Sequence, residues 1–223
     1  MIKTIMILGF LLSIGPRPAI GQCLCPEGEG DLVFSHEFGG SQKLIICGFA
    51  NKNYDTGKVE SYSDITVIDC RDNQILLSIE PAETDLRLQM FRFQLREGCV
   101  FIQHIIRLPS EPGWRWAPRP FLEKKVSPVD GRLTISDWQD VFVVPPKTQE
   151  EIAAFLDIYE NHFDMAGDVL EIPDKLMLCA LNNSHKAERF LVEFPKDHKR
   201  IFDGALPETY YEVLDFYRRV QKK

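Results

Sequence analysis

The sequence predicts an α+β fold, with an antiparallel β-sheet in its N-terminal part and about four α-helices in its C-terminal part. From residue 31 to about residue 108, apolar and polar residues alternate with the period of half-buried strands. Short polar turns interrupt this alternation at regular intervals. From residue 145 onward, apolar residues recur with the 3.6-residue period of helices. The strand pattern of the antiparallel sheet is compatible with a sandwich-like arrangement.

The strands are predicted from runs of apolar and β-branched residues that lie between turn residues. They cover residues 32–38, 43–50, 61–70, 75–79 and 99–108. Between residues 85 and 96, the apolar residues change phase by one position. This change indicates either a β-bulge or a break between two strands.

The segment 109–120 has a different composition from the strands around it. Its four prolines exclude a regular helix and a central strand, so we predict a loop. Beyond this loop, Asp130-Gly131 is typical of a two-residue hairpin turn between strands 121–126 and 132–136. We expect this hairpin to complete a β domain that spans residues 22–144.

Residues 145–223 are predicted to form a helical region that packs on the β part. Thr148 and Glu151 form a capping box at the start of the first helix, which ends near Phe163. The second helix has Pro173 in its first turn and runs to Leu181.

Two further helices complete this region. Ser184 can cap the third helix, which Pro195 ends, and Pro207 starts the fourth. The residues expected to face the core are Ile152, Phe155, Leu156, Tyr159, Ala187, Phe190, Leu191, Phe194, Tyr210, Val213, Leu214 and Tyr217.

Residues 1–21 have the layout of a cleavable signal peptide. Lys3 precedes an apolar run from Thr4 to Gly15, which is too short to span a hydrocarbon core of ~30 Å. Small residues at Ala19 and Gly21 predict cleavage before Gln22. We therefore expect a secreted or periplasmic protein with no transmembrane segment. Lipid attachment at Cys23 is an alternative, which the preceding Gln22 does not favour.

The charge of the chain limits its partners. Residues 1–21 contain two basic residues and no acidic one, so the mature chain has 24 basic and 33 acidic residues and a formal charge of −9. An acidic chain without a basic stripe argues against binding to nucleic acid or to an anionic membrane.

All six cysteines lie after the predicted leader, and export makes disulfides plausible. We predict a bridge between Cys47 and Cys70, because they lie on adjacent predicted strands. Cys179 lies in a predicted helix and is expected to be a buried free thiol. Cys23 and Cys25 are separated by one residue and lack further ligands at metal-site spacing, so we predict no metal and no cofactor.

The best binding candidates lie in the loop 109–120. Trp114, Arg115, Trp116 and Arg119 are of the residue types most enriched at interaction hot spots, and a proline-stiffened loop loses little entropy on docking. The alternative is structural: both tryptophans cover the junction between sheet and helices, and the arginines are solvated or paired with acidic residues.

No pattern of catalytic residues was recognised. His36 and His104 fall in apolar phases of predicted strands and are expected to be hydrogen-bonded core histidines, whereas His162, His185 and His198 lie near helix ends. Asp137 and Asp140 flank a tryptophan as glycosidase carboxylates can, but such pairs arise by chance in an acidic chain.

Three functions are compatible with these features. We expect an exported protein that is not an enzyme and acts as a binding or protein-interaction module. A hydrolase that assembles acidic and histidine residues from distant strands is the second reading. A lipid-anchored envelope component is the third, and it depends on Cys23.

Overall fold

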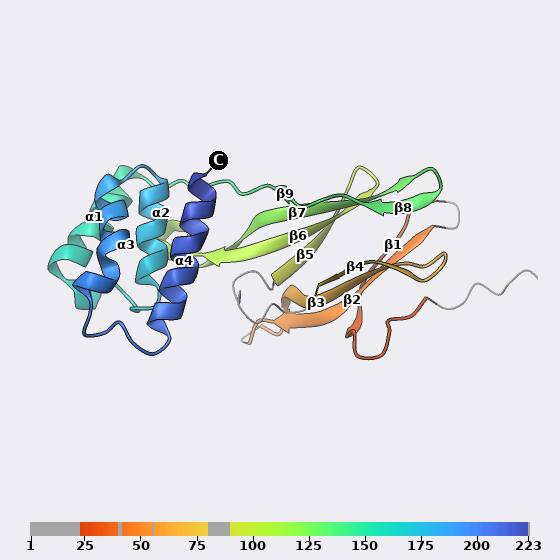
Figure 1. The fold of residues 1–223 in the computed structure, drawn as a ribbon, viewed down its shortest axis with the longest axis horizontal. Helices are drawn as coiled ribbons and strands as arrows, with labels where there is room; N and C mark the ends of the chain where they lie inside the picture. The colour runs from red at the N-terminus through yellow and green to blue at the C-terminus, as the bar shows by residue number, and fades with distance from the viewer. Residues whose placement is uncertain (1–22, 40–41, 55, 80–89, 223) are drawn as a thin grey trace, which may run out of the picture.

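The computed structural model describes residues 23–39, 42–54, 56–79 and 90–222. Over these ranges, nine strands form one antiparallel sheet and four α-helices follow it, so the predicted α+β fold is confirmed. Figure 1 shows the strands at one end of an elongated molecule and the helices at the other. The predicted signal peptide and its cleavage site lie outside the described residues.

The sheet has the strand order β1-β2-β3-β5-β6-β7-β8, with β4 also paired to β3 and β9 also paired to β7. The strands are β1 (Asp31–Glu37), β2 (Lys43–Lys52), β3 (Val59–Asp69), β4 (Gln74–Ile79), β5 (Met90–Arg96), β6 (Cys99–Leu108), β7 (Ala117–Val129), β8 (Arg132–Ile135) and β9 (Gln139–Asp140). In the segment with the predicted phase change, residues 85–89 lie outside the described residues, and the rest forms β5.

A corner within β3 folds the sheet into two layers. Residues 65–69 of β3 pair with β4, whereas Tyr62 pairs with Phe91 of β5. Between these two parts, the pairing with β2 shifts opposite Gly48, and Asp64 has a φ of 50°. A bulge of this kind bends a strand. Figure 1 accordingly shows β1–β4 in one layer and β5–β9 in the other, as in a sandwich.

The inner faces of the two layers enclose the first hydrophobic core. It consists of Leu44, Ile46, Ile65, Val67, Phe91, Val100, Ile102, Val126 and Leu133. These residues come from β2, β3, β5, β6, β7 and β8, so both layers contribute to one core. Burial of this apolar area stabilises the sandwich at about 25 cal/mol per Å².

The outer face of β2 is also apolar, and the first described residues cover it. Ile45 and Cys47 on this face form a small cluster with Ile68 and Cys70. Two disulfides hold residues 23–30 against this cluster. A Cβ on Gly30 would lie 2.4 Å from a backbone oxygen of β2, so only glycine fits there.

The disulfides differ from the predicted one. Cys23 is bridged to Cys70 and Cys25 to Cys47, with Cα–Cα distances of 5.2 and 5.6 Å, so the predicted bridge between Cys47 and Cys70 is wrong. The register explains the error. Cys47 lies opposite Thr66. The amide of Cys70 instead bonds to the carbonyl of Lys43, which comes four residues before Cys47 in β2. The two cysteines are thus about 13 Å apart along the strands, beyond the reach of a disulfide.

Strand β7 begins earlier than predicted, at Ala117, so the last residues of the segment 109–120 are not a loop. Pro118 and Pro120 pair with β6 in the register of the ladder. Proline is tolerated at a sheet edge, and β9 pairs with β7 only further along, at Leu122 and Glu123. The predicted turn at Asp130-Gly131 is confirmed, but β9 follows this hairpin and adds one more strand.

The helices are α1 (Gln149–Asn161), α2 (Ile172–Leu181), α3 (His185–Asp197) and α4 (Leu206–Gln221). The capping box of Thr148 and Glu151 is present, and Ser184 caps α3 as predicted. Pro195 does not end α3, which continues for two more residues. Because proline has no N–H, the carbonyl of Leu191 loses its helical donor, and the hydroxyl of Tyr210 donates to it instead at 3.0 Å.

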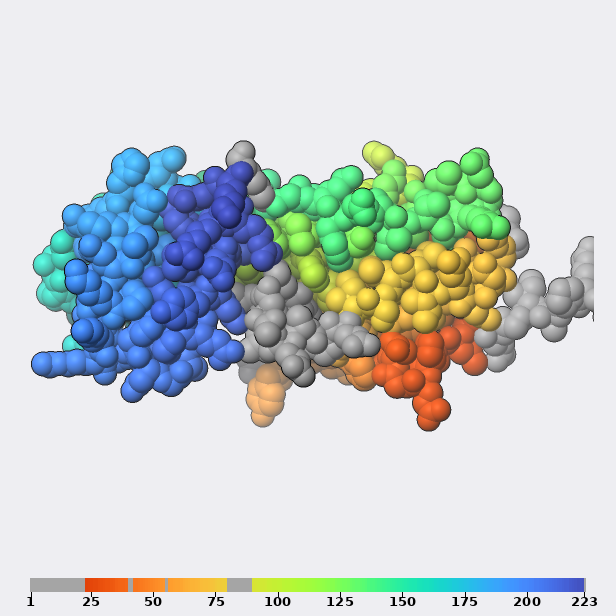
Figure 2. Space-filling model, in the orientation of Figure 1, coloured from red at the N-terminus to blue at the C-terminus, as the bar shows by residue number. Residues whose placement is uncertain are grey.

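The second hydrophobic core joins the helices to the sheet. Its residues come from all four helices and from the ends of β6 and β7, which contribute Ile106, Leu108 and Phe121. Every predicted core residue of the helices is buried except Phe190, which is half-buried. Figure 2 shows the helical end in blue, next to the strands of the sandwich. Cys179 is buried and free in this core as predicted, and burial raises the pKa of its thiol to about 12.

Candidate functional site

The four residues predicted to bind a partner lie at the junction between sheet and helices. The indole of Trp114 is half-buried against the helical core, with its ring centre 5.1 Å from that of Phe155. The ammonium of Lys147 lies 4.4 Å from the same indole and donates to the carbonyl of Glu111 at 2.9 Å. Burial lowers the pKa of Lys147.

Trp116 is tied to helix α2 by a hydrogen bond. Its indole N–H donates to Oε1 of Glu171 at 2.9 Å. The other carboxylate oxygen of Glu171 lies 3.2 Å from the ammonium of Lys175, whose side chain is 8% exposed. One carboxylate therefore serves both a donor from the β part and a buried cation of the helical part.

The two arginines of the segment differ in exposure. Arg119 donates to the hydroxyl of Ser110 at 2.8 Å and forms an ion pair with Glu111 at 2.5 Å. Arg115 is exposed, and its Nε donates to the carbonyl of Pro112. These contacts agree with the structural alternative, in which the tryptophans cover the junction. A binding role for the four residues stays a prediction.

His104 lies in the sheet interior as expected, but no described residue forms a hydrogen bond with its ring. Its ring lies between Phe91, at 4.3 Å, and Trp138, at 4.7 Å. Both ring nitrogens are buried without a hydrogen-bond partner, which corrects the expectation of a satisfied core histidine. Burial lowers the pKa of His104 to about 4, because an imidazolium would be poorly solvated there.

The other histidines and the acidic pair have surroundings that differ from those of His104. His36 packs edge-on against Phe38, and the side chains of His162 and His185 are exposed. Nε2 of His198 lies 2.8 Å from the hydroxyl of Tyr159, beside a hollow of about 400 Å³ that two aspartates also line. Asp140 accepts from the amide of Phe142, and Asp137 is exposed.

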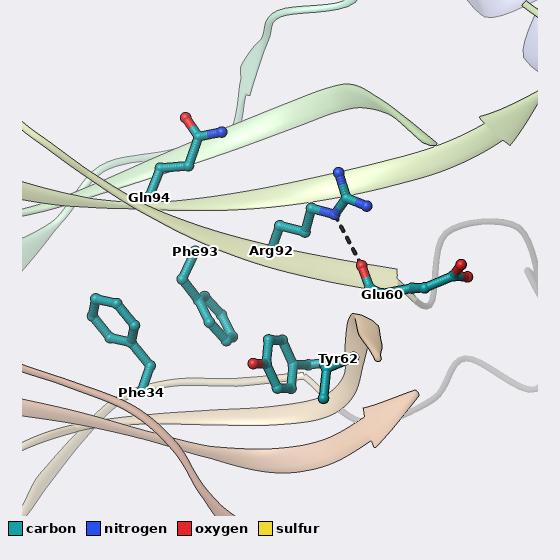
Figure 3. Close-up of a pocket in the computed structure, with 7 residues that line it drawn as sticks. Phe34, Glu60, Tyr62, Arg92, Phe93 and Gln94 are labelled. Atoms are coloured by element: carbon teal, nitrogen blue, oxygen red, sulfur yellow. Dashed lines mark hydrogen bonds between the residues drawn. The ribbon is translucent and has the colours of Figure 1, made fainter. Parts of the chain in front are cut away.

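A hollow of about 270 Å³ lies at the seam between the two layers of the sandwich. We call this hollow the seam hollow. It is lined by Phe34 of β1, by Val59, Glu60 and Tyr62 of β3, and by Arg92, Phe93 and Gln94 of β5. Figure 3 shows the rings of Phe34, Tyr62 and Phe93 gathered on one side of it. The ring centre of Phe93 is 5.1 Å from that of Tyr62 and 5.6 Å from that of Phe34.

The seam hollow exists because β3 and β5 stop pairing after one residue. Continued from the pair of Tyr62 and Phe91, the register would match residues 59–61 with residues 92–94, and these segments line the hollow instead. The Arg92 side chain replaces part of the missing ladder: its Nε donates to the carbonyl of Glu60 at 2.9 Å (Figure 3). Beyond Phe91, no described strand pairs with this edge of β5.

A second, smaller hollow of about 110 Å³ adjoins the first. Both hollows are lined by Glu60 and Arg92. The second is also lined by Ser61, Met90, Ile105, Arg107, Trp116 and Pro118. Arg107 forms an ion pair with Glu60 at 3.3 Å, with both side chains more than a third exposed. Trp116 thus takes part in both the junction and this hollow.

The arrangement at the seam is suited to recognition. It presents aromatic rings, guanidinium groups and an unpaired strand edge, and these bind apolar groups, carboxylates and extended backbone respectively. Within the described ranges, no three His, Cys, Asp or Glu side chains lie close enough to hold a metal ion. None of the described helices is both long and apolar enough to cross a membrane.

Sequence reasoning missed the residues of the seam, although part of the signal was readable. Residues 91–96 read Phe-Arg-Phe-Gln-Leu-Arg, which is an alternation of apolar and mostly cationic side chains. Such a pattern predicts a two-faced strand, but it does not reveal that one edge lacks a partner. Comparison of the chain with protein-family models, with curated proteins and with solved structures found no match.

Proposed function

We propose that the chain is an exported binding module that is not an enzyme and that accepts an extended polypeptide segment at the free edge of β5. The observation that carries this proposal is the early separation of β3 and β5. A strand edge with unpaired N–H and C=O groups is a template for another strand. In β-strand addition, main-chain hydrogen bonds supply affinity and neighbouring pockets select alternate side chains.

The surroundings of the edge support this mode of binding. Residues from both faces of β5 line the seam hollow, since Phe93 lies on one face and Arg92 and Gln94 on the other (Figure 3). An added strand would therefore meet an aromatic wall with every second side chain. The free stretch, residues 92–96, has the length of a typical short strand.

The disulfides support the exported location. Cys23–Cys70 and Cys25–Cys47 are of the kind that persists in oxidising compartments. The bridge occupies the sulfur of Cys23, so that atom cannot also carry a lipid. This supports a free exported chain over the lipid-anchored alternative.

Selection from a library of random linear peptides tests the proposed function. The oxidised chain is expected to enrich peptides that bind it, and Phe93→Ala is expected to weaken their binding about tenfold or more. Phe101→Ala removes a ring of equal size from the neighbouring strand outside the seam hollow and serves as the matched control. Phe34→Leu provides a second variant that removes an aromatic ring of the wall while keeping a large apolar side chain.

Circular dichroism establishes that each variant is folded before its affinity is measured. The proposal fails if the wild-type chain enriches no peptide. It also fails if the enriched peptides bind the Phe93 and Phe34 variants as well as they bind the wild type, since the site would then lie elsewhere.

A further inference from the structure

The edge of β5 that no described strand covers, called the free edge here, has two chemically different faces. Phe91 and Phe93 face the sandwich core, and Leu95 shares their phase along the strand. Arg92, Gln94 and Arg96 alternate with them on the opposite face. A strand that adds to this edge has the same period of two. Its odd and even side chains would therefore meet an apolar surface and a cationic surface respectively.

The cationic face has more guanidinium groups than carboxylates next to the seam hollow. Nε of Arg92 bonds to a backbone carbonyl, while its two terminal nitrogens have no hydrogen-bond acceptor among the described residues. Arg107 lines the same second hollow as Arg92. The one carboxylate among the lining residues of this hollow belongs to Glu60, so two guanidinium groups face one acidic group.

The ion pair within this cluster is weak enough to be replaced. The side chains of Arg107 and Glu60 are 46% and 40% exposed, and exposed pairs contribute at most about 1 kcal/mol. Arg96, by contrast, is bound to Glu123 and lies over the ring of Phe101. Arg92 and Arg107 are therefore the two arginines of this face that can donate hydrogen bonds to an incoming carboxylate.

From this geometry, and resting on the proposed function, we infer the class of ligand: an extended polypeptide segment in which apolar and acidic residues alternate. Its apolar side chains lie against Phe34, Tyr62 and Phe93. Its acidic side chains lie on the opposite face, where a carboxylate bonds to Arg92 and Arg107 beside Trp116. Guanidinium–carboxylate hydrogen bonds are among the strong ones in proteins, because both partners are charged and the geometry is bidentate.

Three blocked synthetic peptides test this inference by fluorescence anisotropy. In each, valine alternates with glutamate, with serine or with lysine. The glutamate peptide is expected to bind about tenfold more tightly than the serine peptide, and the lysine peptide more weakly than both. Arg92→Gln and Arg107→Gln should each reduce the preference for glutamate, and Arg107→Glu should shift it toward lysine. Arg132→Gln changes an exposed arginine of β8 that lines neither hollow, and it is the matched control.

The outcomes separate this inference from the proposed function. If all three peptides bind equally and Phe93→Ala abolishes this binding, the proposed function stands and the preference for acidic residues is overturned. No binding by these peptides and no enrichment from the random library would overturn both. Light scattering measures self-association of the chain. If the chain self-associates and Phe93→Ala abolishes this, a second copy is the occupant of the edge and the inference is overturned.

Discussion

Two regions of the molecule combine tryptophan, phenylalanine or tyrosine with arginine, and they use these residues differently. In the segment 109–120, the indole N–H of Trp116 and the guanidinium of Arg119 bond to Glu171 and Glu111 of the same chain. At the seam, the two terminal nitrogens of Arg92 have no hydrogen-bond acceptor among the described residues. The aromatic rings of Phe34, Tyr62 and Phe93 line a hollow there. Residue types alone thus do not distinguish a joint within the protein from the recognition site that we propose. The two regions differ instead in the partners of their polar atoms.

The largest effect is expected in the joint, on replacing Trp114 by alanine. This change removes a half-buried indole that packs on Phe155 and holds the ammonium of Lys147. The free energy of unfolding should fall by about 3 kcal/mol, measured by urea denaturation. Arg115→Ala in the same segment should change it by less than about 0.5 kcal/mol. Equal effects of the two substitutions would show that the segment is not a joint.

The next effect is a loss of stability at low pH, caused by His104 of β6. This strand contributes residues to both hydrophobic cores. The pKa of His104 is about 4 in the folded chain and about 6.5 when unfolded, so between these values the unfolded chain binds more protons. Stability is then complete above pH ~6.5 and decreases as the pH falls toward ~4, by about 2 kcal/mol near pH 5. His104→Phe keeps a flat ring between its neighbours and should remove this loss. An unchanged pH dependence in that variant would assign the loss to other groups.

A smaller effect is expected at the link between Trp116 and helix α2. Trp116→Phe removes the N–H that donates to Glu171 and should lower the free energy of unfolding by about 1 kcal/mol. Glu171→Gln should cost more, because Lys175 is buried and loses its carboxylate as well. If Trp116→Phe left stability unchanged while Arg119→Gln lowered it, the joint would depend on the arginine instead.

The smallest effect on stability is expected at the seam. Arg92→Gln removes one hydrogen bond to a backbone carbonyl and should change the free energy of unfolding by about 0.5 kcal/mol or less. Thermal unfolding followed by circular dichroism measures this change. A loss as large as that of Trp114→Ala would show that Arg92 holds the two layers together, which would make the seam a second joint.

The helical part was predictable because its signals are local. The capping box of Thr148 and Glu151 lies within one turn, and the apolar period places the inward-facing residues of α1 and α4. The turn at Asp130-Gly131 is equally local, since both residues adopt the positive φ that the pair favours. In each case, the residues that determine the structure are adjacent in the sequence.

The disulfides and the seam were not predictable, because they depend on register between distant strands. The bulge of β3 opposite Gly48 sets which residues face Cys47, and the return of residues 23–30 across β2 leaves no periodic signal. The alternation in β5 was visible, but its free edge results from where β3 turns away. The single sequence holds no local pattern that encodes such a divergence.

Amide hydrogen exchange of residues 92–96 can show whether β5 has a free edge. In an antiparallel strand, successive amides point to opposite sides, so the amides of residues 92–96 bond alternately to β6 and face the seam. We predict protection that alternates from residue to residue in the free chain and becomes uniform when a selected peptide is bound. Uniform protection of these amides in the chain alone would mean that the edge is already paired, and it would rule out peptide binding there.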